Sequence, residues 1–162
     1  MTIVVGLSNF IGSFIALYAI SRFGRKFNIV WGVLLQAVGF LLLYIGYKQN
    51  EFWIQALSVV IYIVFFAIGL GGSLMAYLSE ILPPVGISIA LAVQWLVTAL
   101  IGQFLLTFVS IFGATTMILF FASACLFFFF SLDYLMIETK GKNEDTITRQ
   151  FENRTYRFLD FK

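Results

Sequence analysis

The side chains of this chain that could do chemistry are carboxamides, a few carboxylates and clustered Lys and Arg, because His is absent and Cys125 is the single cysteine. Zinc clusters, haem ligation, Cys-His nucleophiles and disulfide frameworks are excluded on those grounds. A carboxamide such as that of Asn9 can bond hydroxyl groups, and leaving it unpaired in apolar surroundings costs a few kcal/mol. We therefore expect no catalytic residue, no metal site and no cofactor, and we take the chain not to be an enzyme.

The elements that must position these groups are membrane-spanning helices. The chain has 162 residues, of which 61% are apolar and 11% charged, whereas a soluble domain is about 45–50% apolar and about 25% charged. A helix crosses the hydrocarbon layer with about 20 apolar residues. Five segments qualify, and they run roughly from Thr2 to Ile20, Phe27 to Tyr47, Phe52 to Leu78, Ile87 to Phe112 and Thr115 to Met136.

These segments predict an all-α membrane protein rather than a barrel, because two of them are apolar all round and do not alternate. Backbone groups in lipid must bond within their own segment, which also favours helices. We expect a five-helix transmembrane bundle over 1–136, embedded in a lipid bilayer, and a charged, partly helical tail over 137–162. Aromatic residues interleaved with arginines in the tail suit an amphipathic helix on the membrane surface or against a partner; a solvated tail is the alternative.

Basic residues gather on one side of this predicted bundle. With five spans, the turn at 22–26, the turn at 83–84 and the tail share one face, which holds nine of the ten Lys and Arg residues, and only Lys48 lies opposite. Because basic loops stay on the cytoplasmic side, we expect the N-terminus outside and the C-terminus on the cytosolic, or matrix, side. A net charge of +2, with basic groups concentrated only beside apolar segments, leaves no footprint for nucleic acid.

Small residues indicate where the helices approach one another. Ser8, Gly12 and Ala16 recur every four residues in the first span, and a glycine-rich stretch from Gly69 to Ser73 occupies the inner half of the third. Small residues at that spacing let helices pack closely in lipid. The glycine-rich stretch can also bend the third helix where it lines a cavity, since glycine holds a regular helix poorly.

Three short charged elements lie at matching depths on the inner face. They read Arg22-Phe23-Gly24-Arg25-Lys26, Ser79-Glu80-Ile81-Leu82-Pro83 and Glu138-Thr139-Lys140-Gly141-Lys142. In the first, Gly24 supplies the backbone freedom of a tight turn, and the cations around it can meet carboxylates at the ends of neighbouring helices. The predicted inner-face charge network comprises Arg22, Arg25, Lys26, Glu80, Glu138 and Lys140. Simple anchoring by basic residues is the alternative.

These elements together resemble the C-terminal half of a sugar porter of the major facilitator superfamily. In that family a basic R-x-G-R-R/K loop, an E-[IL]-[FL]-P element and a P-E-T-K-G tail follow one another in this order. The resemblance covers nearly the whole chain, from the family's eighth helix to its twelfth. It implies a sugar or polyol solute, and an inner-face network of the kind thought to latch the outward-facing state.

Four positions depart from the family's pattern. Ser21 replaces the acid before the first arginine, and Ile137 replaces the proline before the last element. Counted from Glu80, the family's arginine seven residues later is Ile87, and the tryptophan five residues earlier is Met75. Loss of that arginine removes the family's Glu-Arg pair, and loss of the tryptophan removes a stacking surface for a sugar ring.

The resemblance also indicates candidate substrate-binding residues, Asn9, Gln94 and Trp95. Asn9 lies 13 residues before Arg22, the spacing at which the family's eighth helix presents an asparagine to the sugar. Gln94-Trp95 resembles the Asn-Trp pair of the eleventh helix, provided that the preceding loop is somewhat shorter. For Asn9, a hydrogen bond between helices is the alternative role.

Two functional hypotheses follow. Alternating access in this superfamily rocks two six-helix halves about a site near the midplane, and this chain supplies five helices of one half, so we do not expect it to transport alone. The four altered positions favour an accessory membrane subunit that assembles with other membrane protein chains. The intact order of the three charged elements favours the alternative, the C-terminal half of a functional sugar transporter that works with missing helices or a partner chain.

Overall fold

The computed structural model describes residues 2–142, 145–147 and 149–151, and within them five helices are long and apolar enough to cross a membrane. This confirms the predicted all-α membrane fold. The first, second, fourth and fifth spans are α1 (Thr2–Phe23), α2 (Arg25–Gln49), α5 (Pro84–Phe112) and α6 (Ala114–Leu135). The third span is continuous but changes its winding, through α3 (Phe52–Phe66), the π-helix η1 (Ala67–Ser73) and α4 (Leu74–Ile81).

The turns between spans follow local backbone chemistry. Gly24, with φ 97°, separates α1 from α2, and Gly113, with φ 83°, separates α5 from α6. Both values lie in a region that favours glycine. Asn50 ends α2 in the left-handed conformation, which asparagine tolerates. Pro84 begins α5, three residues before the predicted start at Ile87, because proline fits the first turn of a helix.

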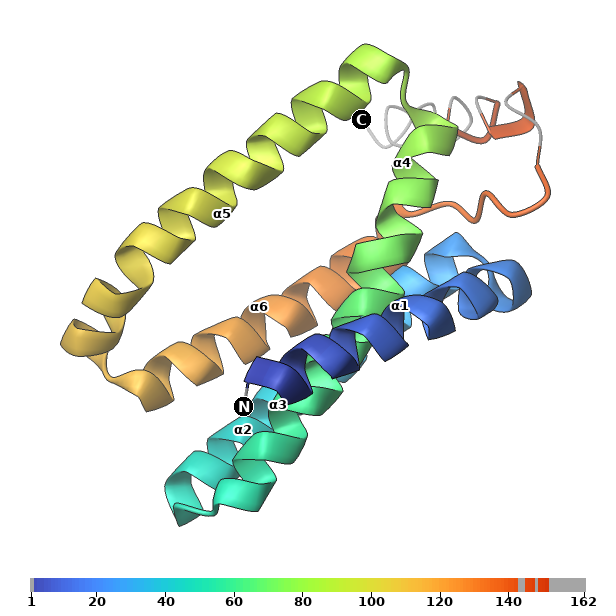
Figure 1. The fold of residues 1–162 in the computed structure, drawn as a ribbon. Helices are drawn as coiled ribbons and strands as arrows, with labels where there is room; N and C mark the ends of the chain where they lie inside the picture. Colours follow the sequence, from blue (N-terminus) through green and yellow to red (C-terminus); the bar gives the residue numbers. More distant parts are fainter. Residues whose placement is uncertain (1, 143–144, 148, 152–162) are drawn as a thin grey trace.

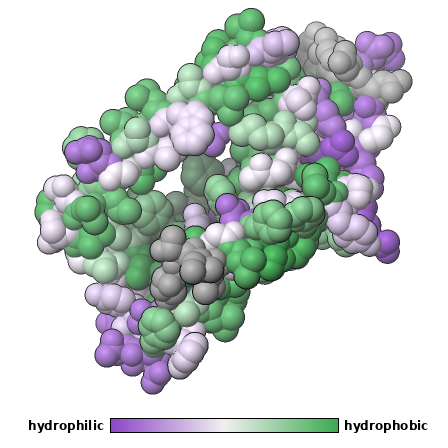
Figure 2. Space-filling model, viewed as in Figure 1, coloured by the Kyte–Doolittle hydropathy of each residue, from purple (hydrophilic) through white to green (hydrophobic). Residues whose placement is uncertain are grey.

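The spans are packed around α2, which contacts α1, α3, η1, α4 and α6 (Figure 1). By contrast, α5 leans away from this group, and of the described spans it contacts only α4 and α6, near its two ends. None of its residues is buried. Figure 2 shows a broad hydrophobic surface between hydrophilic ends, one where α2 turns into α3 and the other where α1 ends and the tail begins.

Glycine brings η1 into close contact with the two helices beside it. A Cβ built on Gly32 of α2 lies 2.7 Å from the Cα of Gly69 in η1, which is closer than real side chains come. On the other side, a Cβ on Gly12 of α1 lies 2.9 Å from the Cβ of Ala67. The glycine-rich stretch therefore has both anticipated properties, since it packs closely and departs from regular α-helical winding.

The start of the tail packs under the inner end of the bundle. Met136 and Ile137 are buried, and Met136 joins an apolar cluster with Ile29 and Tyr77. The hydroxyl of Tyr77 accepts the backbone N–H of Ile137 at 3.4 Å. Residues 145–147 and 149–151 are helical, and the rest of the predicted amphipathic tail beyond residue 151 lies outside the described residues. Apolar side chains at the first tail positions explain why this stretch is packed although the tail as a whole is charged.

Candidate solute-binding cleft and inner-face charge network

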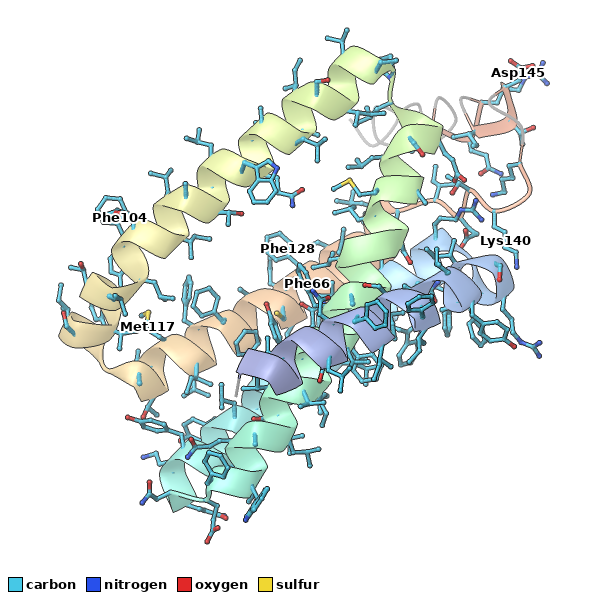
Figure 3. All side chains as sticks on the ribbon, in the orientation of Figure 1. Phe66, Phe104, Met117, Phe128, Lys140 and Asp145 are labelled. Carbon is cyan, nitrogen blue, oxygen red and sulfur yellow. The ribbon has the colours of Figure 1, made fainter. Side chains whose placement is uncertain are left out.

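A cleft of about 780 Å³ lies between α1 and the η1–α4 part of the third span. Its walls are mostly apolar, and Phe66, labelled in Figure 3, lies where α1 crosses the third span. Asn9 and Ser13, one helical turn apart on α1, supply its polar side chains. Gly71 and Gly72 of the third span also line it, and the absence of side chains there keeps it open.

Asn9 presents a free carboxamide to this cleft. The residue is exposed, and its backbone carbonyl accepts a hydrogen bond of 2.9 Å from the Ser13 hydroxyl. Its side chain makes no hydrogen bond with the part of the chain that the structure describes. The Asn9 carboxamide therefore forms no hydrogen bond to a second helix within these residues, which was its alternative role. Ser13 was not among the predicted contacts, although its position one turn after Asn9 places both on one helix face.

Gln94 and Trp95 lie on α5, away from the Asn9 cleft. Both are exposed, Trp95 to 68%. Because α5 does not contact α1, the structure does not bring these two residues together with Asn9. Figure 2 shows the molecule hollowed between α5 and the other spans. The three candidate substrate-binding residues therefore do not line one pocket within the described chain, since Asn9 lines the cleft beside α1 and Gln94 and Trp95 are exposed on α5.

One ion pair of the inner face joins the start of α2 to the end of α4. The guanidinium Nη2 of Arg25 donates to Oε1 of Glu80 at 2.6 Å, and about a quarter of each side chain is exposed. A second guanidinium nitrogen, Nε of Arg25, and Oε2 of Glu80 are buried without a partner among the described residues. The contact therefore has one short bond rather than the two of a bidentate pair.

Glu138 has a different role from that expected of it, because its carboxylate meets backbone N–H groups and not a side-chain cation. Its Oε1 accepts the backbone N–H of Arg25 at 2.9 Å, and those of Thr139 and Lys140 at 3.1 Å each. Glu138 thus caps the N-terminus of α2, where Gly24 has no side chain to do so. A helix preceded by glycine lacks a side chain to accept its first backbone N–H groups. Such a start in the sequence indicates that a residue elsewhere in the chain accepts them.

The remaining cations of the predicted network make other contacts. Nζ of Lys26 lies 2.6 Å from the backbone oxygen of Asp133 and 3.4 Å from its carboxylate, so Asp133 joins the network. Nζ of Lys140 donates to the backbone oxygen of Arg22 at 2.8 Å. The Arg22 side chain reaches neither Glu80 nor Glu138 in the described chain. These contacts place the three charged elements at one end of the bundle.

The Arg25–Glu80 contact predicts a measurable coupling. We expect Arg25→Gln and Glu80→Gln each to lower the free energy of unfolding by about 1–2 kcal/mol, less than for a fully buried pair because water reaches both groups. The double variant should lose about 1 kcal/mol less than the sum of the single variants. Denaturant unfolding in detergent micelles measures the cycle, with Lys48→Gln at the other end as control. Strictly additive losses would show that the pair contributes nothing.

Comparison with known proteins agrees with this architecture. Residues 1–151 match the family described as sugar (and other) transporter. A probable metabolite transport protein of Saccharomyces cerevisiae is 30% identical over 157 residues, which cover 93% of this chain and 28% of that protein. The galactose-proton symporter of Escherichia coli is 30% identical over 158 residues, covering 91% of this chain and 34% of the symporter.

Solved structures give the same result. An inward-open structure of the xylose transporter XylE from E. coli matches with a TM-score of 0.79 and 28% identity, covering 89% of this chain and 34% of that one. The fold is therefore that of one part of a major facilitator membrane transporter. The chain belongs to the sugar transporter family, which confirms the resemblance. It spans about a third of the length of these relatives, which are transport proteins and not enzymes.

Proposed function

We propose that this chain forms one wall of a sugar-translocation pathway and transports only together with further membrane helices. The observation that carries the proposal is the free carboxamide of Asn9 in an open cleft beside η1. Transporter sites are commonly built where a span departs from regular helical winding near the midplane. A carboxamide with no partner in the described chain is suited to bond solute hydroxyl groups.

The solute class comes from the relatives. The E. coli symporter is named for galactose and the E. coli transporter of solved structure for xylose, and both are sugars with several hydroxyl groups. The weak packing of α5 supports a need for more helices, because none of its residues is buried and Gln94 and Trp95 are exposed. Exposing a polar amide to lipid costs free energy. A further helix or a water-filled path beside Gln94 would remove this cost and stabilise the complete transporter. In the proposed orientation the basic end of the bundle faces the cytosol or the matrix.

A second candidate is a non-transporting accessory subunit, and Met75 favours it because an aromatic platform for a sugar ring is missing there. The Ile87 replacement is weaker support for this candidate, since Glu80 has Arg25 as its partner in place of the lost arginine. The two candidates differ in one measurable property. A transporter part supports solute flux once its missing helices are supplied, and an accessory subunit does not.

Uptake of radiolabelled galactose into liposomes tests the proposal. We expect no saturable uptake by the chain alone, and saturable uptake when it is reconstituted with helices one to seven of the galactose-proton symporter. Asn9→Ala should then raise the KM about ten-fold, the effect of losing one hydrogen bond of about 1.4 kcal/mol. Gln103→Ala, which removes an exposed amide of α5, is the matched control.

Each outcome of this experiment separates the candidates. Stereospecific uptake by the chain alone refutes the need for further helices. A KM that is the same for Asn9→Ala and for the unchanged chain refutes the solute contact. Absence of flux in the reconstituted mixture, with the two parts shown to associate, favours the accessory subunit.

A further inference from the structure

The inner end of the bundle holds carboxylates that are already engaged. Glu80 pairs with Arg25, and Asp133 is the partner of Lys26. The carboxylate of Glu138 accepts backbone N–H groups at the start of α2. Any further cation at this end therefore has no free carboxylate beside it among these acids.

Two such cations, Arg22 and Lys140, lie at the last turn of α1. The Arg22 guanidinium makes a single, long hydrogen bond of 3.5 Å to the hydroxyl of Tyr18, a neutral group. Lys140, labelled in Figure 3, donates to the backbone oxygen of Arg22 at 2.8 Å, so its charge lies beside that residue. Both residues are exposed, and neither forms an ion pair within the described chain. Two positive charges at the end of α1 thus have no anionic partner among the described residues.

The residue before Arg22 explains part of this excess of positive charge at the end of α1. Ser21 is uncharged, and its hydroxyl turns back to the carbonyl of Tyr18 at 2.7 Å instead of meeting Arg22. An acid at this position would have lowered the net positive charge at this end of α1. This chain leaves the site electropositive, which makes it a place for an anion from outside the protein.

An exposed apolar strip leads from the membrane interior to these cations. Ile11, Ile15, Tyr18 and Arg22 follow one another at helical spacing, so they lie on one face of α1. The side chains of Ile11, Ile15 and Tyr18 are 43% to 61% exposed. A tyrosine between an apolar strip and a cation is typical of the membrane–water boundary. The strip and the two charges together match an amphiphile with an anionic head and an apolar tail.

We propose that Arg22 and Lys140 bind the phosphate of an anionic phospholipid, whose acyl chain lies along Ile11 and Ile15. A guanidinium binds phosphate oxygens through two parallel N–H groups, and a lysine adds a point charge. Anionic lipids attract each interfacial Lys or Arg, whereas a zwitterionic headgroup carries no net charge to attract. The proposal does not depend on solute transport, and it needs only a chain that spans the bilayer.

Retention of phosphatidylglycerol by the full chain in detergent micelles, measured by native mass spectrometry, tests the site. Phosphatidylcholine is the neutral comparison. We expect Arg22→Gln and Lys140→Gln each to weaken phosphatidylglycerol binding about five-fold, and the double variant about 25-fold. Lys48→Gln, which removes a cation at the opposite end of the bundle, should leave binding unchanged. Arg22→Lys, which keeps the charge but loses the two parallel N–H groups, should weaken binding about two- to three-fold, less than Arg22→Gln does.

Several outcomes would overturn the proposal. Equal retention by the double variant and the unchanged chain shows that the two residues bind no headgroup. An equal loss in Lys48→Gln shows that binding follows total charge and not this site. Displacement of phosphatidylglycerol by an equal concentration of inorganic phosphate identifies a site for free phosphate, to which the acyl chain contributes nothing. Circular dichroism checks folding, and if Arg22→Gln does not fold, the exposed Lys140→Gln variant decides the test alone.

Discussion

Replacing Gly32 with alanine lowers the free energy of unfolding of this chain by about 1–3 kcal/mol, the usual cost of overpacking. A Cβ at this position lies 2.7 Å from the Cα of Gly69 and 3.2 Å from the carbonyl oxygen of Phe65. Both neighbours are backbone atoms, so neither can rotate away as a flexible side chain would. The methyl group must therefore push α2 away from η1. Thermal or denaturant unfolding in detergent micelles measures the loss.

Gly102→Ala is the matched control for this variant. Gly102 lies within α5, and nothing is within 4 Å of a Cβ built on it. The same substitution there should be neutral or stabilising by about 0.5–1 kcal/mol, because alanine holds a helix better than glycine. Equal effects at the two positions would mean that the contact between α2 and η1 is not close in the folded protein.

The sequence predicts the spans because their identity depends on local composition alone. An apolar run of sufficient length must be helical in lipid wherever its neighbours lie. The helix ends are less certain, since they depend on single residues such as Pro84, which starts α5 before the predicted position. The outward lean of α5 is not predictable from its residues. It depends on contacts between spans, and among the described residues α5 contacts other spans only near its two ends.

The charge network shows the same division between local and distant information. Arg25 and Glu80 are 55 positions apart, and helices that turn back at one face bring them together as expected. The backbone bonds of Glu138 are harder to foresee, because a carboxylate next to cations can bind a side chain or a helix terminus. Which of these two partners Glu138 binds depends on where the tail crosses the start of α2. The partner of Asn9 is equally hard to foresee. An asparagine side chain is expected to form hydrogen bonds, but the sequence does not say whether a neighbouring helix supplies the partner.

Gly24→Ala destabilises the chain by about 2–4 kcal/mol because it changes the backbone and the cap of α2 together. The φ of 97° is unfavourable for alanine, which costs about 1–3 kcal/mol. A Cβ there also lies 2.7 Å from Oε2 of Glu138. That carboxylate must move, and the N–H of Arg25 then loses its acceptor, at about 1 kcal/mol. Unfolding of the variant in detergent micelles measures the combined loss.

Gly113→Ala separates the two parts of this effect. Gly113 has a similar φ of 83°, but nothing lies within 4 Å of its Cβ position, so this variant incurs only the backbone strain. The Gly24→Ala, Glu138→Ala double variant should lose less stability than the sum of its single variants, since the clash and the lost cap are one event. Additive losses would mean that the Glu138 carboxylate does not lie over Gly24, and that α2 begins without the cap.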